Sequence, residues 1–95
     1  MEKIRILVAD DHPTFRDGLC RFIEEESDLE VVAKAMDGEE TVRLAKELKP
    51  DVAIIDVAMP KMNGIEAAKQ IKAMYPEMAI LMVSAFKYEI GRAHV

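Results

Sequence analysis

The sequence has a single cysteine, no excess of basic residues and no long apolar run, and each absence excludes a class of protein. Cys20 alone cannot form an internal disulfide, so we expect a core position for its thiol and a reducing, cytoplasmic compartment. Acidic residues outnumber basic ones by 18 to 13, and the resulting charge of −5 argues against direct binding of nucleic acid by this segment. The apolar runs are too short for a signal peptide or a membrane span, so we expect no membrane contact.

The chain also has no internal repeat, linker or low-complexity stretch. Its 95 residues, of which 51% are apolar and 33% charged, fit one globular domain near the lower size limit for an independent core. A second domain has no room.

What the chain does contain is a regular alternation of short apolar runs and amphipathic segments. The runs predict strands at residues 4–9, 30–35, 52–55 and 79–83, and their nearly continuous apolar character is typical of strands buried on both faces. Helical spacing predicts helices that begin at Pro13 and that span residues 39–48 and 65–75. This order indicates an α/β fold in which helices cover both faces of a parallel sheet.

Polar residues follow the predicted strands at their carboxyl ends, where open α/β sheets bind ligands. Asp10 and Asp11 follow the first strand, Asp56 the third and Ser84 the fourth. If the first and third strands are neighbours, three carboxylates crowd together and need a cation. Oxygen ligands without a Cys/His cluster match Mg²⁺ better than zinc. The alternative for any one of these acids is an ordinary turn residue at a strand end.

His12 lies beside these acids in the sequence. It could be a metal ligand or a proton shuttle, but a polar residue at the start of a helix is the simpler interpretation. We therefore leave His12 outside the predicted site.

The order and spacing of these motifs resemble the receiver domains of two-component response regulators. The resemblance runs from about residue 3 to residue 87, and its fold is the flavodoxin-like doubly wound (βα)5 sheet. The start of the first helix is similar to that of the LuxR-type subfamily, whose members carry a C-terminal helix-turn-helix. The matching segments are Asp10-Asp11-His12-Pro13, residues 15–19, Asp56 after its apolar strand, the loop 59–64 and Ser84-Ala85.

The resemblance implies a role for each matching residue. Asp56 would accept a phosphoryl group, and Asp11 and Asp56 would bind Mg²⁺ directly together with the backbone carbonyl of Ala58. Asp10 would act on the metal largely through ordered water. Ser84 would donate its hydroxyl to the phosphoryl group and shift toward it. Three further residues would have structural roles: Ala85 would leave space beside that group, while Pro60 and Gly64 would shape a backbone bend in the loop after Asp56.

The resemblance also implies partners. A sensor histidine kinase would donate the phosphoryl group, DNA would be bound only by a further C-terminal domain, and the parent protein could form a homodimer on phosphorylation. The module would not be an enzyme beyond assisting its own phosphorylation and dephosphorylation. Two alternatives are a pseudo-receiver that serves only as an interaction surface and a Mg²⁺-dependent phosphatase-like hydrolase. The intact acidic trio argues against the first, and Ala58, where a hydrolase would have a second Asp, argues against the second.

The sequence departs from the family pattern toward its end. A complete receiver has a fourth helix, a fifth strand that supplies a lysine, and a fifth helix, and none of these can be read in this sequence. We expect residues 1–89 to be a partial receiver domain and residues 90–95 to be a non-native tail. One back-translation of Ile90-Gly91-Arg92-Ala93-His94-Val95 reads as the start of a common sequencing adapter.

Overall fold

Four strands and three helices alternate along the described part of the chain. The computed structural model describes residues 2–84. The strands are β1 (Ile4–Ala9), β2 (Leu29–Ala35), β3 (Val52–Asp56) and β4 (Ala79–Val83), and the helices are α1 (Pro13–Glu24), α2 (Gly38–Leu48) and α3 (Gly64–Met74). Among residues 2–84, no helix has the length and apolar character needed to cross a bilayer.

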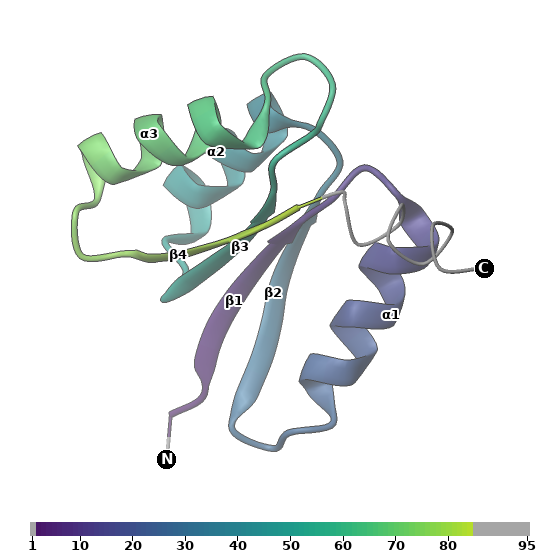
Figure 1. The fold of residues 1–95 in the computed structure, drawn as a ribbon. Coiled ribbons are helices and arrows are strands. Elements are labelled where there is room, and N and C mark those ends of the chain that lie inside the picture. Colours follow the sequence, from purple (N-terminus) through teal and green to yellow (C-terminus); the bar gives the residue numbers. More distant parts are fainter. Residues whose placement is uncertain (1, 85–95) are drawn as a thin grey trace.

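All four strands are parallel and lie in the order β2-β1-β3-β4 (Figure 1). β1 and β3 are therefore the central strands of the described sheet, although 42 residues separate the end of one from the start of the other. The chain moves outward to β2 on one side and to β4 on the other, so the strand order reverses between β1 and β3. In open α/β sheets this reversal is where ligands bind.

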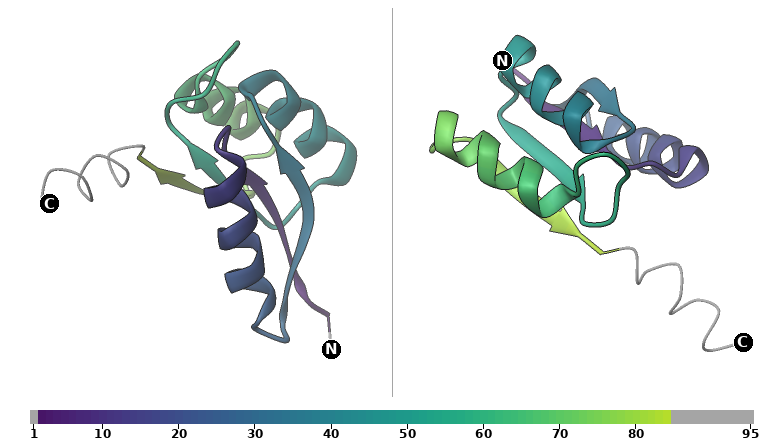
Figure 2. Two further views of the ribbon diagram at one scale, coloured as in Figure 1. Left: turned by 90° about the vertical axis from the view of Figure 1, so that its right-hand side faces the viewer. Right: turned by 90° about the horizontal axis from the view of Figure 1, so that it is seen from above.

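Helices cover both faces of the sheet, α1 on one side and α2 with α3 on the other (Figures 1 and 2). Alternation along the strands explains the two layers, because neighbouring side chains point to opposite faces. Ile6 and Val8 pack with Cys20 and Ile23 of α1. The larger core lies under α2 and α3 and contains Leu7, Ala9, Ala35, Val42, Ala45, Ala53, Ile55, Met59, Ala67, Ile71 and Met78.

Short polar side chains define where α2 and α3 begin. Asp37 accepts a hydrogen bond from the Glu40 backbone N–H at 2.8 Å, and Asn63 accepts one from the Glu66 N–H at 2.9 Å. These bonds satisfy amide groups that the first turn of a helix leaves without partners. α2 ends at Lys49, whose φ of 46° is left-handed. The start of α2 is thus fixed next to the loop that follows β2, and the start of α3 next to the loop that follows β3.

The structure confirms the predicted fold class and all seven predicted elements within residues 2–84, and the predicted boundaries agree or differ by one residue. Asp56 is the last residue of β3, one residue beyond the predicted apolar run of residues 52–55. The expected tail at residues 90–95 lies outside the described residues, and so does Ala85.

Candidate functional site

Three carboxylates meet at the carboxyl ends of the two central strands. Ala9 of β1 pairs with Ile55 of β3, so Asp10 and Asp56 follow neighbouring residues in adjacent strands. Asp11 is the next residue along the chain. The strand order, rather than closeness in sequence, brings these acids together.

Asp10 is held rigidly, with only 1% of its surface exposed. Its backbone N–H donates to the Ala35 carbonyl at 3.0 Å, and its own carbonyl accepts a hydrogen bond from the Arg16 guanidinium at 3.0 Å. Its Oδ1 accepts a hydrogen bond from the His12 backbone N–H at 2.8 Å. Bonds to β2 and α1 therefore hold the backbone of Asp10, and the bond from His12 holds its side chain.

Asp11 and His12 form the more open side of the cluster. The Asp11 carboxylate is 31% exposed, and its Oδ1 lies 3.1 Å from Nδ1 of His12. That Oδ1 atom is buried, and it accepts no hydrogen bond from the part of the chain that the structure describes. The same Nδ1 atom is 3.4 Å from Oδ1 of Asp10. His12 is the N-cap residue of α1 but makes no side-chain cap, so its imidazole faces the acids instead.

Asp56 is completely buried at the end of β3. Its Oδ1 accepts a hydrogen bond from the Ala58 backbone N–H at 3.3 Å, which places the start of the following loop beside the carboxylate. Asp56 also pairs with Val83 of β4, and the Val57 N–H donates to the Val83 carbonyl at 2.9 Å. Ser84, the residue after Val83, is thus set at the same end of the sheet and is exposed.

Together these residues form a group that could hold a metal ion. Asp10, Asp11, His12 and Asp56 each offer one ligand atom, and these atoms lie within 4.8 Å of one another. At 4.8 Å and an effective dielectric constant of about 20, two unit charges repel by roughly 3 kcal/mol. Three carboxylates at this spacing therefore favour a bound cation, and the buried Asp11 oxygen is suited to coordinate one.

The structure brings together the three predicted acids, places the Ala58 N–H beside Asp56 and places Ser84 at the same end of the sheet, while the chemical role of each residue stays a prediction. Sequence reasoning considered His12 as a metal ligand and left it outside the site, whereas the structure places its Nδ1 atom 3.1 Å from Oδ1 of Asp11. Sequence reasoning also assigned the backbone bend of the loop after Asp56 to Pro60 and Gly64. The left-handed residue of the loop is Lys61, with φ 69°, and no described glycine has a positive φ.

Gly64 is required for a different reason, which is close packing. A Cβ atom at this position would overlap the Asp56 carbonyl oxygen and lie 2.8 Å from the carbonyl carbon. The Gly64 N–H also donates to the Val57 carbonyl at 2.8 Å. The start of α3 is thereby fixed against the end of β3.

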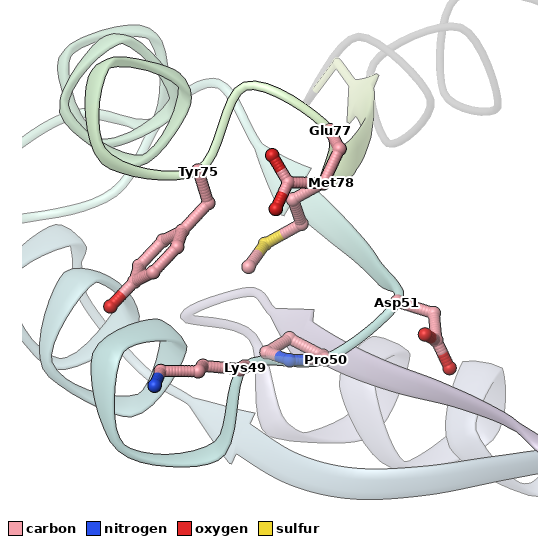
Figure 3. Close-up of a pocket in the computed structure, with 6 residues that line it drawn as sticks. All are labelled: Lys49, Pro50, Asp51, Tyr75, Glu77 and Met78. Carbon is pink, nitrogen blue, oxygen red and sulfur yellow. The ribbon is translucent and has the colours of Figure 1, made fainter.

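A hollow of about 210 Å³ lies at the opposite end of β3 and β4 (Figure 3). Its lining comes from the segments that precede these two strands: Lys49, Pro50, Asp51, Tyr75, Glu77 and Met78. The Asp51 side chain points away from the others in Figure 3, so the hollow does not gather carboxylates. The acidic group at the carboxyl ends is therefore the better candidate site.

Comparison with known proteins gives a consistent match. The family described as response regulator receiver domain matches residues 6–94. The transcriptional regulatory protein LiaR of Bacillus subtilis is 52% identical over 56 residues, which is 59% of this chain and 26% of LiaR. A protein-glutamate methylesterase/protein-glutamine glutaminase of Maricaulis maris is 49% identical over 57 residues, or 60% of this chain and 14% of that protein.

A solved structure matches over more of the chain. The response regulator domain of Thermotoga maritima CheB has a TM-score of 0.85 and 45% sequence identity, with 90% of this chain and 63% of that chain covered. The aligned segment spans about a quarter of LiaR and a smaller part of the methylesterase. Both curated relatives are therefore much longer than this chain.

Proposed function

Because the chain belongs to the family of response regulator receiver domains, we propose that it accepts a phosphoryl group on Asp56 from a sensor histidine kinase, with Mg²⁺ in the acidic pocket. The observation that carries this proposal is the buried Asp56 carboxylate, gathered with Asp10 and Asp11 at the point where the strand order reverses. Phosphoryl transfer needs a positioned nucleophile and neutralised charge more than it needs acid–base chemistry, and this pocket is suited to supply both.

In the proposed reaction, a carboxylate oxygen of Asp56 attacks the phosphorus of a phosphohistidine. A phosphorus–oxygen bond forms, the phosphorus–nitrogen bond breaks, and the donor imidazole leaves with the electron pair. The hydrogen bond from the Ala58 N–H orients Asp56 for this attack. Ser84 would then donate its hydroxyl to the phosphoryl oxygens. The product is an acyl phosphate.

Asp11, Asp56 and the backbone carbonyl of Ala58 would hold the Mg²⁺, with Asp10 acting through water. When bound, Mg²⁺ would offset the negative charge of the carboxylates and of the phosphoryl oxygens. The Arg16 guanidinium has an indirect role, because its hydrogen bond to the Asp10 carbonyl keeps Asp10 in place.

The output belongs to parts of the parent protein beyond this domain. We propose a DNA-binding output because LiaR is a transcriptional regulatory protein, although the Maricaulis maris relative is a protein-glutamate methylesterase/protein-glutamine glutaminase. A cytoplasmic location and a homodimer formed on phosphorylation follow from the same proposal. On this view the domain catalyses only its own phosphorylation and dephosphorylation.

The test exposes the chain to acetyl phosphate with Mg²⁺ and measures intact mass. We expect a gain of one phosphoryl group that hydroxylamine removes, as acyl phosphates require, and no gain in Asp56→Asn. Asp28→Asn is the matched control, because Asp28 is an exposed turn acid far from the pocket, and it should gain mass as the unaltered chain does. An equal gain in Asp56→Asn would refute the assigned acceptor.

A further inference from the structure

His12 adds to the acidic pocket a donor that Mg²⁺ does not require. Mg²⁺ prefers oxygen ligands, whereas imidazole nitrogen is a ligand for zinc and the later first-row transition metals. The imidazole neither caps α1 nor points away from the site, and it lies against two of the three carboxylates.

The spacing of these atoms fits donors on a single ion. Two donors bound to one tetrahedral zinc ion at about 2.0–2.2 Å lie about 3.3–3.6 Å apart. Nδ1 of His12 is 3.1 Å from Oδ1 of Asp11 and 3.4 Å from Oδ1 of Asp10. The widest separation in the group, at most 4.8 Å, would need to close by about 1.5 Å. The buried Oδ1 of Asp11, which accepts no hydrogen bond from residues 2–84, faces the imidazole.

We propose that His12 enables this pocket to bind zinc or a similar late transition metal through one nitrogen and three carboxylate oxygens. This inference rests on the proposed function, because the same acids would hold Mg²⁺. Four protein donors complete a tetrahedral shell, whereas the Mg²⁺ site must keep positions open for water and phosphoryl oxygens. A zinc ion held in this way excludes the phosphoryl donor, so the metal that occupies the pocket decides whether Asp56 can be phosphorylated.

The test measures Zn²⁺ and Mg²⁺ dissociation constants by isothermal titration calorimetry. His12→Ala removes the nitrogen, and His12→Asn removes it while keeping a residue that favours the N-cap position of α1. Both variants should bind Zn²⁺ at least about tenfold more weakly, with Mg²⁺ affinity changed by less than about twofold. The matched control is His94→Ala, which removes the chain's other histidine and should leave both constants unchanged.

Visible absorption of bound Co²⁺ gives a second readout, because tetrahedral nitrogen and oxygen coordination produces strong bands that the His12 variants should lose. Zn²⁺ binding that both variants retain, in a chain that binds Mg²⁺, would overturn this inference alone. A chain that binds Zn²⁺ through His12 but never binds Mg²⁺ would support the inference and contradict the proposed Mg²⁺ site. Loss of Zn²⁺ binding in His94→Ala would also overturn the inference, since it would place the ion elsewhere.

Discussion

Gly64→Ala is a substitution for which the structure predicts a large loss of stability from the addition of one methyl group. The added methyl group would meet the backbone of β3, where its Cβ would lie 2.8 Å from the Asp56 carbonyl carbon and 2.9 Å from Cγ2 of Ile55. Carbon atoms normally approach to about 3.5–4.0 Å, so the start of α3 must move by about 0.7 Å or more. A rotamer change cannot relieve this overlap, because most of it involves main-chain atoms of a strand paired on both sides.

We therefore expect Gly64→Ala to lower the free energy of unfolding by about 3 kcal/mol, the upper part of the range for an overpacked core. Gly18→Ala is the control, because we expect it to change the free energy of unfolding in the opposite direction. Gly18 is exposed inside α1, nothing lies within 4 Å of its added Cβ, and alanine is the better helix former. This change should raise the free energy of unfolding by about 0.5–1 kcal/mol.

Urea unfolding followed by far-UV circular dichroism measures both effects. If Gly64→Ala is too unstable for a folded baseline, it can be measured in the Gly18→Ala background, because the two effects should add at sites without shared contacts. An unfolding midpoint for Gly64→Ala at or above that of the unaltered chain would refute the reasoning. So would a large loss of stability in Gly18→Ala.

Two further predictions concern the backbone and the core. Lys49→Gly should raise the free energy of unfolding by about 1 kcal/mol, because Lys49 has the left-handed φ of 46° that glycine adopts without strain, and a lower urea midpoint would contradict this. Burial raises the pKa of the Cys20 thiol above its ordinary value. The buried, protonated Cys20 thiol therefore contributes fully to stability below the pKa of the thiol in the unfolded chain. This contribution is lost as the pH rises through the higher pKa of the thiol in the folded chain. Between about pH 7 and about pH 10, the urea midpoint should fall more for the unaltered chain than for Cys20→Ala, and equal losses would contradict the assignment.

The elements could be predicted because their signals are local. Each strand is a short apolar run, and β1 and β3 are followed or ended by an acid, so both the strand and the site residue can be read from a few consecutive letters. The sorting of Ile6 and Leu7 to opposite faces of the sheet follows from alternation alone. Placing Asp10 beside Asp56 needed one further assumption, that β1 and β3 are neighbours, and the strand order confirms it.

What could not be predicted depends on contacts between distant segments or on side-chain direction. The role of Gly64 comes from the approach of α3 to the Asp56 carbonyl, and no local pattern distinguishes this from a glycine needed for a bend. The left-handed residue Lys61 carries no sequence signal, because lysine has no preference for that conformation. His12 was correctly placed at the start of a helix, yet its imidazole turns toward the acids rather than capping the helix.

The two parts of the candidate site differ in how firmly the sheet supports them. Asp10, Asp11 and Asp56 are attached to β1 and β3, each of which pairs with strands on both sides. Ser84 follows β4, the edge strand of the described sheet, where Leu81 is 55% exposed. Segments with less burial open at lower free-energy cost, so we expect the end of β4, with Ser84, to move more readily than the acids on the two central strands. The proposed phosphorylation of Asp56 would use this division, because Asp56 would have to stay aligned while Ser84 moves toward the phosphoryl group.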